Sequence, residues 1–198
     1  PADHEPNGTS DYVKEYTLTT AYDISTATVT ATKLIFVSGT HEKNTTVLPT
    51  QVVFNNDGTK MFTVNHTGTT SNPVPNVDYW SLSTAFDLGS TVTLEGRYDI
   101  SAQEIRANSI AFNNDGTKMF VTGNDGKDVN EYTLSTGFDV STASFVDSFN
   151  VTSQDAFPSD LAFNSDGTKM FVVGVGGDDI YEYTLSTGFD VSTASYDS

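Results

Sequence analysis

The fold is decided by a nine-residue stretch, Phe54-Asn55-Asn56-Asp57-Gly58-Thr59-Lys60-Met61-Phe62. The same nine residues occur again from Phe112 and, with one change, from Phe163. A second string, EYTLSTGFDVSTAS, starts at Glu131 and again at Glu182, and looser copies start at Glu15 and Asp78. The leucine of this second string recurs at steps of 64, 52 and 51 residues, at Leu18, Leu82, Leu134 and Leu185. Near-verbatim copies at a fixed step indicate a repeat protein with a unit of 51 or 52 residues and an insertion in the first unit.

Each unit predicts four short strands, which we call A to D. In the last unit, strand A is predicted over 159–164, strand B over 170–173 and strand C over 180–185, and strand D is clearest one unit earlier, over 144–151. Asp166-Gly167 supplies the tight turn between A and B, since glycine takes a positive φ without steric cost. No stretch has a sustained apolar period of 3.6 residues, so almost no helix is expected.

Strand B is apolar on both faces, and a four-stranded antiparallel unit of this kind must be stacked between copies of itself. Propeller blades do this. A solenoid of stacked β-coils is the alternative, but such repeats are usually shorter and have parallel strands. The Asp-Gly turn makes A and B an antiparallel hairpin, which favours the propeller.

The run P-x-x-L-A-F-N-x-D-G-T-K-M-F-V-V-G, which starts at Pro158, resembles the beginning of a YVTN-type or WD-like β-propeller blade. The matching residues are Pro158, Leu161, Phe163, Asp166, Gly167 and Phe171, and in the first copy Pro49, Phe54, Asp57, Gly58 and Phe62. The long C-to-D connection, 135–143, departs from that family. The resemblance implies a fold rather than a function, because propellers host enzymes, receptors and scaffolds alike.

The predicted organisation is an all-β propeller of four-stranded antiparallel blades, about three and a half per chain. We expect a poorly ordered tail over 1–10, a half blade over 11–46, blades over 47–104 and 105–155, and a partial blade over 156–198. A closed ring typically needs ~4–8 blades. We therefore expect either that copies of the chain assemble into a closed ring, a two-fold dimer first, or that the chain is part of a longer repeat array.

The charge excludes several classes of partner. The 198 residues contain 26 acidic and 9 basic side chains, a formal net charge of −17, and no cysteine. Nucleic acid and anionic bilayers need a basic patch, so neither is an expected partner. No apolar run approaches the ~18 residues of a membrane span. An acidic surface stays soluble in salty water, which fits an extracellular or cell-envelope location.

Ligand contacts are predicted on the face where the repeats differ. The A–B and C–D connections are nearly invariant, whereas the B–C and D–A connections vary, as surface loops also do without any function. The start of strand A should ring the central channel on that variable face. The predicted ligand-binding residues are Gln51, Arg106, Asn108, Ser159 and Asp160, together with His66 and Trp80. Trp80 takes the place of the threonine in Glu-Tyr-Thr, either as a sugar platform or packed on its strand.

Metal binding and catalysis have weaker signals. Asp125, Asp128, Asp178 and Asp179 lie in two glycine-flanked B–C loops and are candidates for calcium or magnesium, although solvated acidic loops have the same composition. The aspartates of the Asp-Gly turns are explained by turn chemistry. Nothing in the sequence pairs a histidine with a nucleophile. Glu15, Glu131 and Glu182 recur and are interpreted as structural, which leaves Glu95 and Glu104 as the individual glutamates worth testing.

The sequence favours a non-catalytic binding module, with a glycan or protein held on the variable loop face and no cofactor beyond a candidate calcium. Verbatim repetition supports this reading, because enzymes usually break repeat symmetry around the channel. The alternative is a propeller-type lyase or hydrolase that uses channel carboxylates and a divalent metal.

Overall fold

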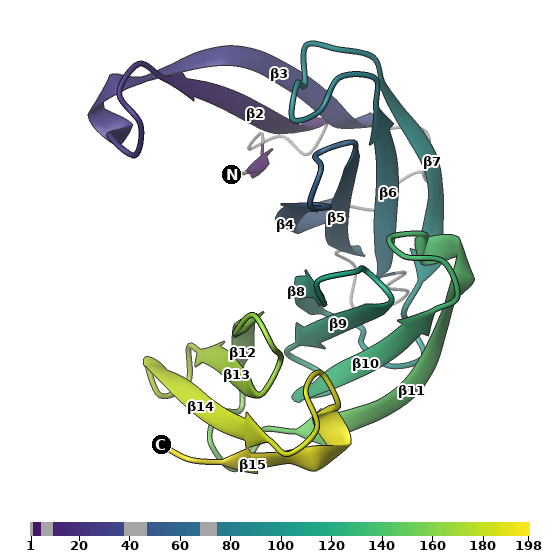
Figure 1. The fold of residues 1–198 in the computed structure, drawn as a ribbon, viewed down its shortest axis with the longest axis vertical. Helices are drawn as coiled ribbons and strands as arrows, with labels where there is room; N and C mark the ends of the chain where they lie inside the picture. Colours follow the sequence, from purple (N-terminus) through teal and green to yellow (C-terminus); the bar gives the residue numbers. More distant parts are fainter. Residues whose placement is uncertain (1, 5–9, 38–46, 68–74) are drawn as a thin grey trace.

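The computed structural model describes residues 2–4, 10–37, 47–67 and 75–198 (Figure 1). These residues form four antiparallel sheets, in which hydrogen-bonded neighbours follow one another along the chain. Sheet 1 contains β1 (Ala2–His4), β2 (Ser10–Leu18) and β3 (Ala27–Val37). Sheet 2 contains β4 (Val47–Phe54), β5 (Lys60–Thr67), β6 (Asn76–Leu82) and β7 (Val92–Asp99). Sheet 3 contains β8 (Ala107–Phe112), β9 (Lys118–Gly123), β10 (Asp128–Leu134) and β11 (Ala143–Asn150). Sheet 4 contains β12 (Pro158–Phe163), β13 (Lys169–Gly174), β14 (Asp179–Leu185) and β15 (Ala194–Tyr196).

The sheets stand side by side in an arc that is open on one side (Figure 1). The first strands of sheets 2 to 4 line the inside of the arc, and the last strands lie on its outside. Helical structure in the described residues is confined to three 3-10 turns, η1 (Ile24–Thr26), η2 (Val140–Thr142) and η3 (Val191–Thr193). The predicted A-B-C-D unit and its all-β, four-stranded antiparallel form are confirmed.

Sheet 1 differs from the predicted half blade. The structure places Ala2–His4, which we had assigned to a poorly ordered tail, in a strand that pairs antiparallel with β2. This short strand takes the position of a strand B and satisfies backbone groups along an edge of β2 that would otherwise lack a partner. Residues 1 and 5–9 of the predicted tail lie outside the described part of the chain.

Three apolar cores fill the spaces between consecutive sheets. Sheets 1 and 2 share a core around Val13, Met61 and Trp80, and sheets 2 and 3 share one around Phe62, Val77 and Tyr132. Sheets 3 and 4 are joined by a third, which includes Phe120 and Tyr183. A middle sheet therefore contributes to two cores, one on each face, which is why no single unit could remain soluble alone.

The two invariant strings of the sequence meet in the structure. Phe138, at the C–D connection, has a φ of 57°, and its N–H donates to the carbonyl of Gly116 at 2.9 Å. Gly116, in the A–B turn, has a φ of 71°, and a Cβ there would lie 2.3 Å from the Phe138 ring. The same arrangement joins Phe86 to Gly58 and Phe189 to Gly167. Each string thus depends on the other, and both connections lie on one face of the arc.

The aspartates of the A–B turns have the structural role expected from the sequence. Asp57 Oδ1 accepts hydrogen bonds from the hydroxyl and the N–H of Thr59, and Asp115 and Asp166 do the same with Thr117 and Thr168. These hydrogen bonds, the hydroxyl's first, hold the pKa of all three carboxyls below the usual value. Among the described helical segments, none has the length and apolar character to cross a bilayer.

Candidate functional site

The predicted channel residues lie together at the inner edge of the arc, where they connect the sheets. Ser109 Oγ donates to Asp160 Oδ1 at 2.6 Å and lies 3.2 Å from Gln51 Oε1, which also accepts from the N–H of Ile110 at 2.6 Å. Gln51 Nε2 donates to Asp160 Oδ1 at 3.2 Å. These three side chains hold equivalent positions in sheets 2, 3 and 4. Their hydrogen-bonding groups therefore join the sheets at the hub.

The residues one position earlier in strand A donate hydrogen bonds to backbone carbonyls. Asn108 Nδ2 donates to the carbonyl of Pro158, in the next sheet, at 2.8 Å. Thr50 Oγ1 reaches the carbonyl of Ala107 at 3.2 Å in the same way, and Ser159 Oγ donates to Val173 within its own sheet at 3.1 Å. The polar residues that we expected to contact a ligand thus have structural partners inside the arc.

The loop acids do not gather around a metal position. Arg106 donates from Nε to Asp125 Oδ1 at 2.9 Å, and the two side chains form an ion pair. Asp128 accepts from Asn130 Nδ2 at 2.8 Å, and Asp179 accepts from the N–H of Ile180 at 2.9 Å. Across the described ranges, no group of three or more His, Cys, Asp or Glu side chains is placed to hold a metal ion. Asp178 lies in the turn before β14, where its φ is 55°.

Glu104 has a repeated structural role that the sequence analysis missed. Its fully buried carboxylate accepts from the N–H groups of Arg106 at 2.7 Å, Asp125 at 3.2 Å and Gly126 at 3.0 Å. Asp155 occupies the same position one unit later and accepts from the N–H groups of Phe157, Gly176 and Gly177. Glu104 was expected not to recur, because a search for identical letters does not equate Glu with Asp. The signal was the shared sequence Gln-(Glu/Asp) at 103–104 and 154–155.

The environment of Asp155 shows how this one carboxylate stays charged. Desolvation by burial would raise its pKa, but the backbone hydrogen bonds from Phe157, Gly177 and Gly176 outweigh this effect and lower the pKa below its usual value. The carboxylate ties the D–A connection to the B–C loop of the same sheet.

Trp80 holds a different repeat position from the one we assigned. It pairs with Met61 across β5 and β6, as Tyr132 pairs with Met119 and Tyr183 with Met170. Trp80 therefore replaces the tyrosine of the other units and not the threonine, since its copy is offset by one residue. It is buried in the core between sheets 1 and 2, which is the packing role, and its indole N–H has no hydrogen-bond partner among the described residues.

With the copies aligned by strand register, one repeat position of β6 carries a different type of residue from its counterparts in sheets 3 and 4. Tyr79 pairs with Phe62 as Glu131 pairs with Phe120 and Glu182 with Phe171, so a tyrosine stands in place of the glutamate. Opposite Tyr79 lies Gly96, where a Cβ would come within 2.3 Å of Tyr79 Oη. The ring of Tyr79 therefore fits only because Gly96 has no side chain.

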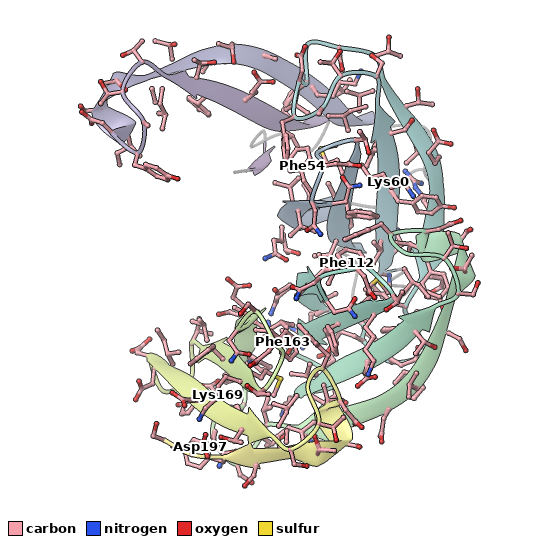
Figure 2. The ribbon with its side chains drawn as sticks, in the orientation of Figure 1. Phe54, Lys60, Phe112, Phe163, Lys169 and Asp197 are labelled. Carbon is pink, nitrogen blue, oxygen red and sulfur yellow. The ribbon has the colours of Figure 1, made fainter. Side chains whose placement is uncertain are left out.

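A cavity of about 340 Å³ lies at this exception, between sheets 2 and 3. It is lined by Lys60, Tyr79, Trp80, Ser81, Glu95, Asp139 and Ser141. Glu95 accepts from Ser81 Oγ at 2.5 Å, and Lys60 Nζ donates to the carbonyl of Phe138 at 2.9 Å. Figure 2 shows Lys60 on β5 in the body of the arc. The cavity lies on the side of the A–B and C–D connections, opposite the face we had predicted for ligands.

The cation in this cavity lacks the carboxylate that its counterparts have. Lys118 forms an ion pair with Glu131 at 2.6 Å and Lys169 one with Glu182 at 2.5 Å, whereas Lys60 has no equivalent pair across β5 and β6, because Tyr79 stands in the glutamate position. After the hydrogen bonds from Thr59, the charge of Lys60 also contributes to the lowered pKa of Asp57 in the A–B turn. Glu131 also accepts from the N–H of Val191 at 2.9 Å. Because Tyr79 replaces that glutamate, the equivalent N–H, that of Val140, receives no carboxylate from the described side chains. Lys60 Nζ and the N–H of Val140 are thus without the bridging glutamate that holds their counterparts in the next pair of sheets.

His66 lies in β5 and is in register with Leu48, but its side chain falls outside the described part of the structure. The variable B–C loop that follows it, 68–74, is also outside the described ranges. The ligand role predicted for His66 therefore remains a prediction.

Comparison with solved structures supports one conclusion about the fold. The chain is similar to a protein from Lactobacillus plantarum at 14% identity, over 100% of this chain and 52% of that one, with a TM-score of 0.59. It is similar to a putative 6-phosphogluconolactonase from Bacteroides fragilis at 13% identity, over 100% of this chain and 52% of that one, with a TM-score of 0.55. The β-propeller domain of Cps50 from Myceliophteria thermophila matches at 10% identity, over 93% and 50% of the two chains, with a TM-score of 0.52.

The chain has a β-propeller fold. At these identities the likeness shows the fold alone, and the four sheets are hereafter called blades 1 to 4. No family model and no curated protein matches the sequence. The propeller described here spans about half the length of the solved structures named above.

Proposed function

We propose that this protein is a non-catalytic binding module that holds a glycan in the cavity between blades 2 and 3. The observation that carries the proposal is the coincidence of the cavity with the break in the repeat: Tyr79 stands in place of a glutamate, and Gly96 makes room for its ring.

The lining suits a saccharide. An aromatic ring offers an apolar surface to the C–H face of a sugar, while carboxylates, a hydroxyl and an ammonium group can hydrogen-bond its hydroxyls. Tyr79, Glu95, Ser81 and Lys60 supply these groups around one volume of about 340 Å³. That volume lies at the lower end of the range of ligand pockets, which suits one or two sugar units.

The missing carboxylate indicates which saccharide fits best. In the neighbouring blade pair, Glu131 binds both Lys118 Nζ and the N–H of Val191. A uronate sugar bound beside Lys60 would bring a carboxylate to the corresponding position, where it would gain a charge-assisted hydrogen bond. We therefore propose an acidic, uronate-containing glycan as the ligand class and an extracellular or cell-envelope location for the encounter.

The hub favours binding over the lyase or hydrolase alternative. The channel carboxylate of Asp160 is held by Ser109 and Gln51 and accepts from the N–H of Leu161 at 2.9 Å. A general acid or base must reach a substrate proton, whereas these three hydrogen bonds to Oδ1 hold the carboxylate against the hub, which supports a structural role for Asp160.

A glycan array that includes neutral and uronate oligosaccharides, followed by titration calorimetry on the hits, tests the proposal. Tyr79→Glu restores the residue of the repeat and should weaken uronate binding at least about tenfold, because its own carboxylate would pair with Lys60. The matched control Tyr79→Phe keeps the ring and should bind within about threefold of the parent chain. An array without uronate hits, or unchanged binding by Tyr79→Glu, would contradict the proposal.

A further inference from the structure

Positions that are buried between blades are exposed on the free face of blade 1. Val140 and Val191 are fully buried, whereas Ile24, at the same repeat position, is 84% exposed. Tyr22 precedes it with a φ of 61°, like Phe138 and Phe189, and is 99% exposed. No blade of the described chain covers this face, although its side chains occupy repeat positions that are core positions in blades 3 and 4.

The free face of blade 4 carries the residues that, in the blades before it, pack against the following blade. Val129 is fully buried against blade 4, whereas Ile180, its counterpart one unit later, is 61% exposed. Phe171 and Phe120 are likewise equivalent, and only Phe120 is fully covered. The side chains on this face belong to the set that receives the next blade.

The polar groups of the two free faces match as well. Within the arc, Lys118 Nζ donates to the carbonyl of Phe189 at 2.6 Å, and Lys60 Nζ does the same to Phe138. Glu131 accepts from the N–H of Val191, and Glu15 accepts from the N–H of Leu88 at 2.8 Å. Every blade thus meets the next through a lysine and a carbonyl, a glutamate and an N–H, or both.

Blade 4 carries the side-chain half of this contact already formed. Lys169 and Glu182 are paired at 2.5 Å, and Lys169 is also held by Asp197 at 2.8 Å (Figure 2). Blade 1 carries the backbone half, the carbonyl of Tyr22 and the N–H of Ile24, at the positions of Phe189 and Val191. The arc has one open side, which lies between blade 1 and blade 4 (Figure 1).

We propose that the free face of blade 4 binds the free face of blade 1 of a second copy of this chain, and that two copies close a ring. Lys169 would reach the carbonyl of Tyr22, Glu182 the N–H of Ile24, and Ile24 would enter the core beside Ile180. With four blades from each chain, the ring would contain eight, within the range of ~4–8 typical of propellers. This inference does not depend on the glycan proposal, because neither face contains the cavity.

The first experiment measures mass in solution by size-exclusion chromatography with light scattering. The parent chain should elute at twice the chain mass of 21.3 kDa. Ile24→Asp and Ile180→Asp should each give the single-chain mass, because every junction of the ring contains both positions. The control Val146→Asp changes a half-exposed residue on β11, in an interior blade, and should keep the doubled mass. A parent chain of single mass, a doubled mass for either end variant, or a mass above two chains would overturn the proposal.

The second experiment separates head-to-tail docking from contacts between like faces. Ile24→Asp and Ile180→Asp chains, each with a different tag, are mixed and captured through one tag. In the proposed ring the mixture has one intact junction, since one chain supplies a normal blade 4 and the other a normal blade 1. Capture of both chains, with neither variant capturing a differently tagged copy of itself, supports the proposal. Capture of a variant by its own copies, or no capture from the mixture, would overturn it.

Discussion

The N–H of Val191 donates to Glu131 Oε2 at 2.9 Å, and this bond fastens the 3-10 turn of one blade to the central strand of the blade before it. Glu131 is almost fully buried and also pairs with Lys118. One carboxylate therefore holds the lysine of its own blade and the backbone of the next. Contacts of this kind explain why the two repeated strings are nearly identical in every unit.

Glu131→Gln should reduce the free energy of unfolding by about 3 kcal/mol, because it leaves the half-buried Lys118 ammonium without its counter-charge and weakens the acceptor of the Val191 N–H. Urea denaturation measures the loss. The matched control is Glu182→Gln, at the same repeat position on the free face of blade 4, in the monomeric Ile24→Asp background. There the pair is partly exposed, and the loss should stay under about 1 kcal/mol. Equal losses would show that the covering blade does not matter.

Gly116→Ala should destabilise the propeller by at least about 2 kcal/mol. The positive φ of Gly116 alone costs an L-residue about 1 kcal/mol, and the new Cβ would overlap the ring of Phe138. Gly89→Ala is the control: the nearest atom to its Cβ is the carboxylate oxygen of Asp87 at 3.0 Å, which has to shift only by a few tenths of an ångström and can keep its hydrogen bond from the N–H of residue 89. A shift in the thermal midpoint distinguishes them, and similar midpoints would contradict the proposed lock between Gly116 and Phe138.

Stability should rise as the pH falls from 7 toward 5. Desolvation raises the pKa of Asp78 to about 6 against the ordinary 3.8, and the opposing effect of Arg97, 2.9 Å away, is smaller. Between these two pKa values the folded chain binds more protons than the unfolded chain, so the free energy of unfolding decreases as the pH increases. The gain amounts to at most about 3 kcal/mol.

Asp78→Asn is the control for this effect. Protonation also relieves the general repulsion of a chain with a net charge of −17, so some gain at low pH should persist in the variant. The variant should be more stable than the parent at pH 7, and the difference should vanish near pH 4. Below that pH the turn aspartates, whose pKa is lowered, become protonated and stability is lost again. Identical pH profiles for variant and parent would contradict the assignment to Asp78.

Glu104→Gln should destabilise the chain by about 2 kcal/mol, since the amide nitrogen would face a backbone N–H in a fully buried site. The same exchange at the exposed Glu95 should cost less than about 0.5 kcal/mol. Urea denaturation of both variants gives the comparison. A loss at Glu95 as large as at Glu104 would argue against the loop-anchoring role.

The spacing of the repeats was enough to predict the blades, because the strand and turn positions follow from residues that recur in each unit. The partners of the polar residues were not predictable in the same way. Gln51, Ser109 and Asp160 differ in type at one repeat position, and only their convergence at the hub shows that they bind one another. The exception at Tyr79 was hidden by a one-residue offset, which the strand register corrects.

Amide hydrogen exchange at three equivalent positions, Ile24, Leu88 and Val191, tests the central claim that each blade is held by the blade before it. The N–H groups of Leu88 and Val191 donate to a glutamate of the preceding blade. At low protein concentration the Ile24 amide should therefore exchange freely while Leu88 and Val191 remain protected. At high concentration Ile24 should become protected like the other two, because blade 4 of a second copy covers it. Rapid exchange at Ile24 at every concentration, or at Leu88 and Val191 as well, would contradict the account.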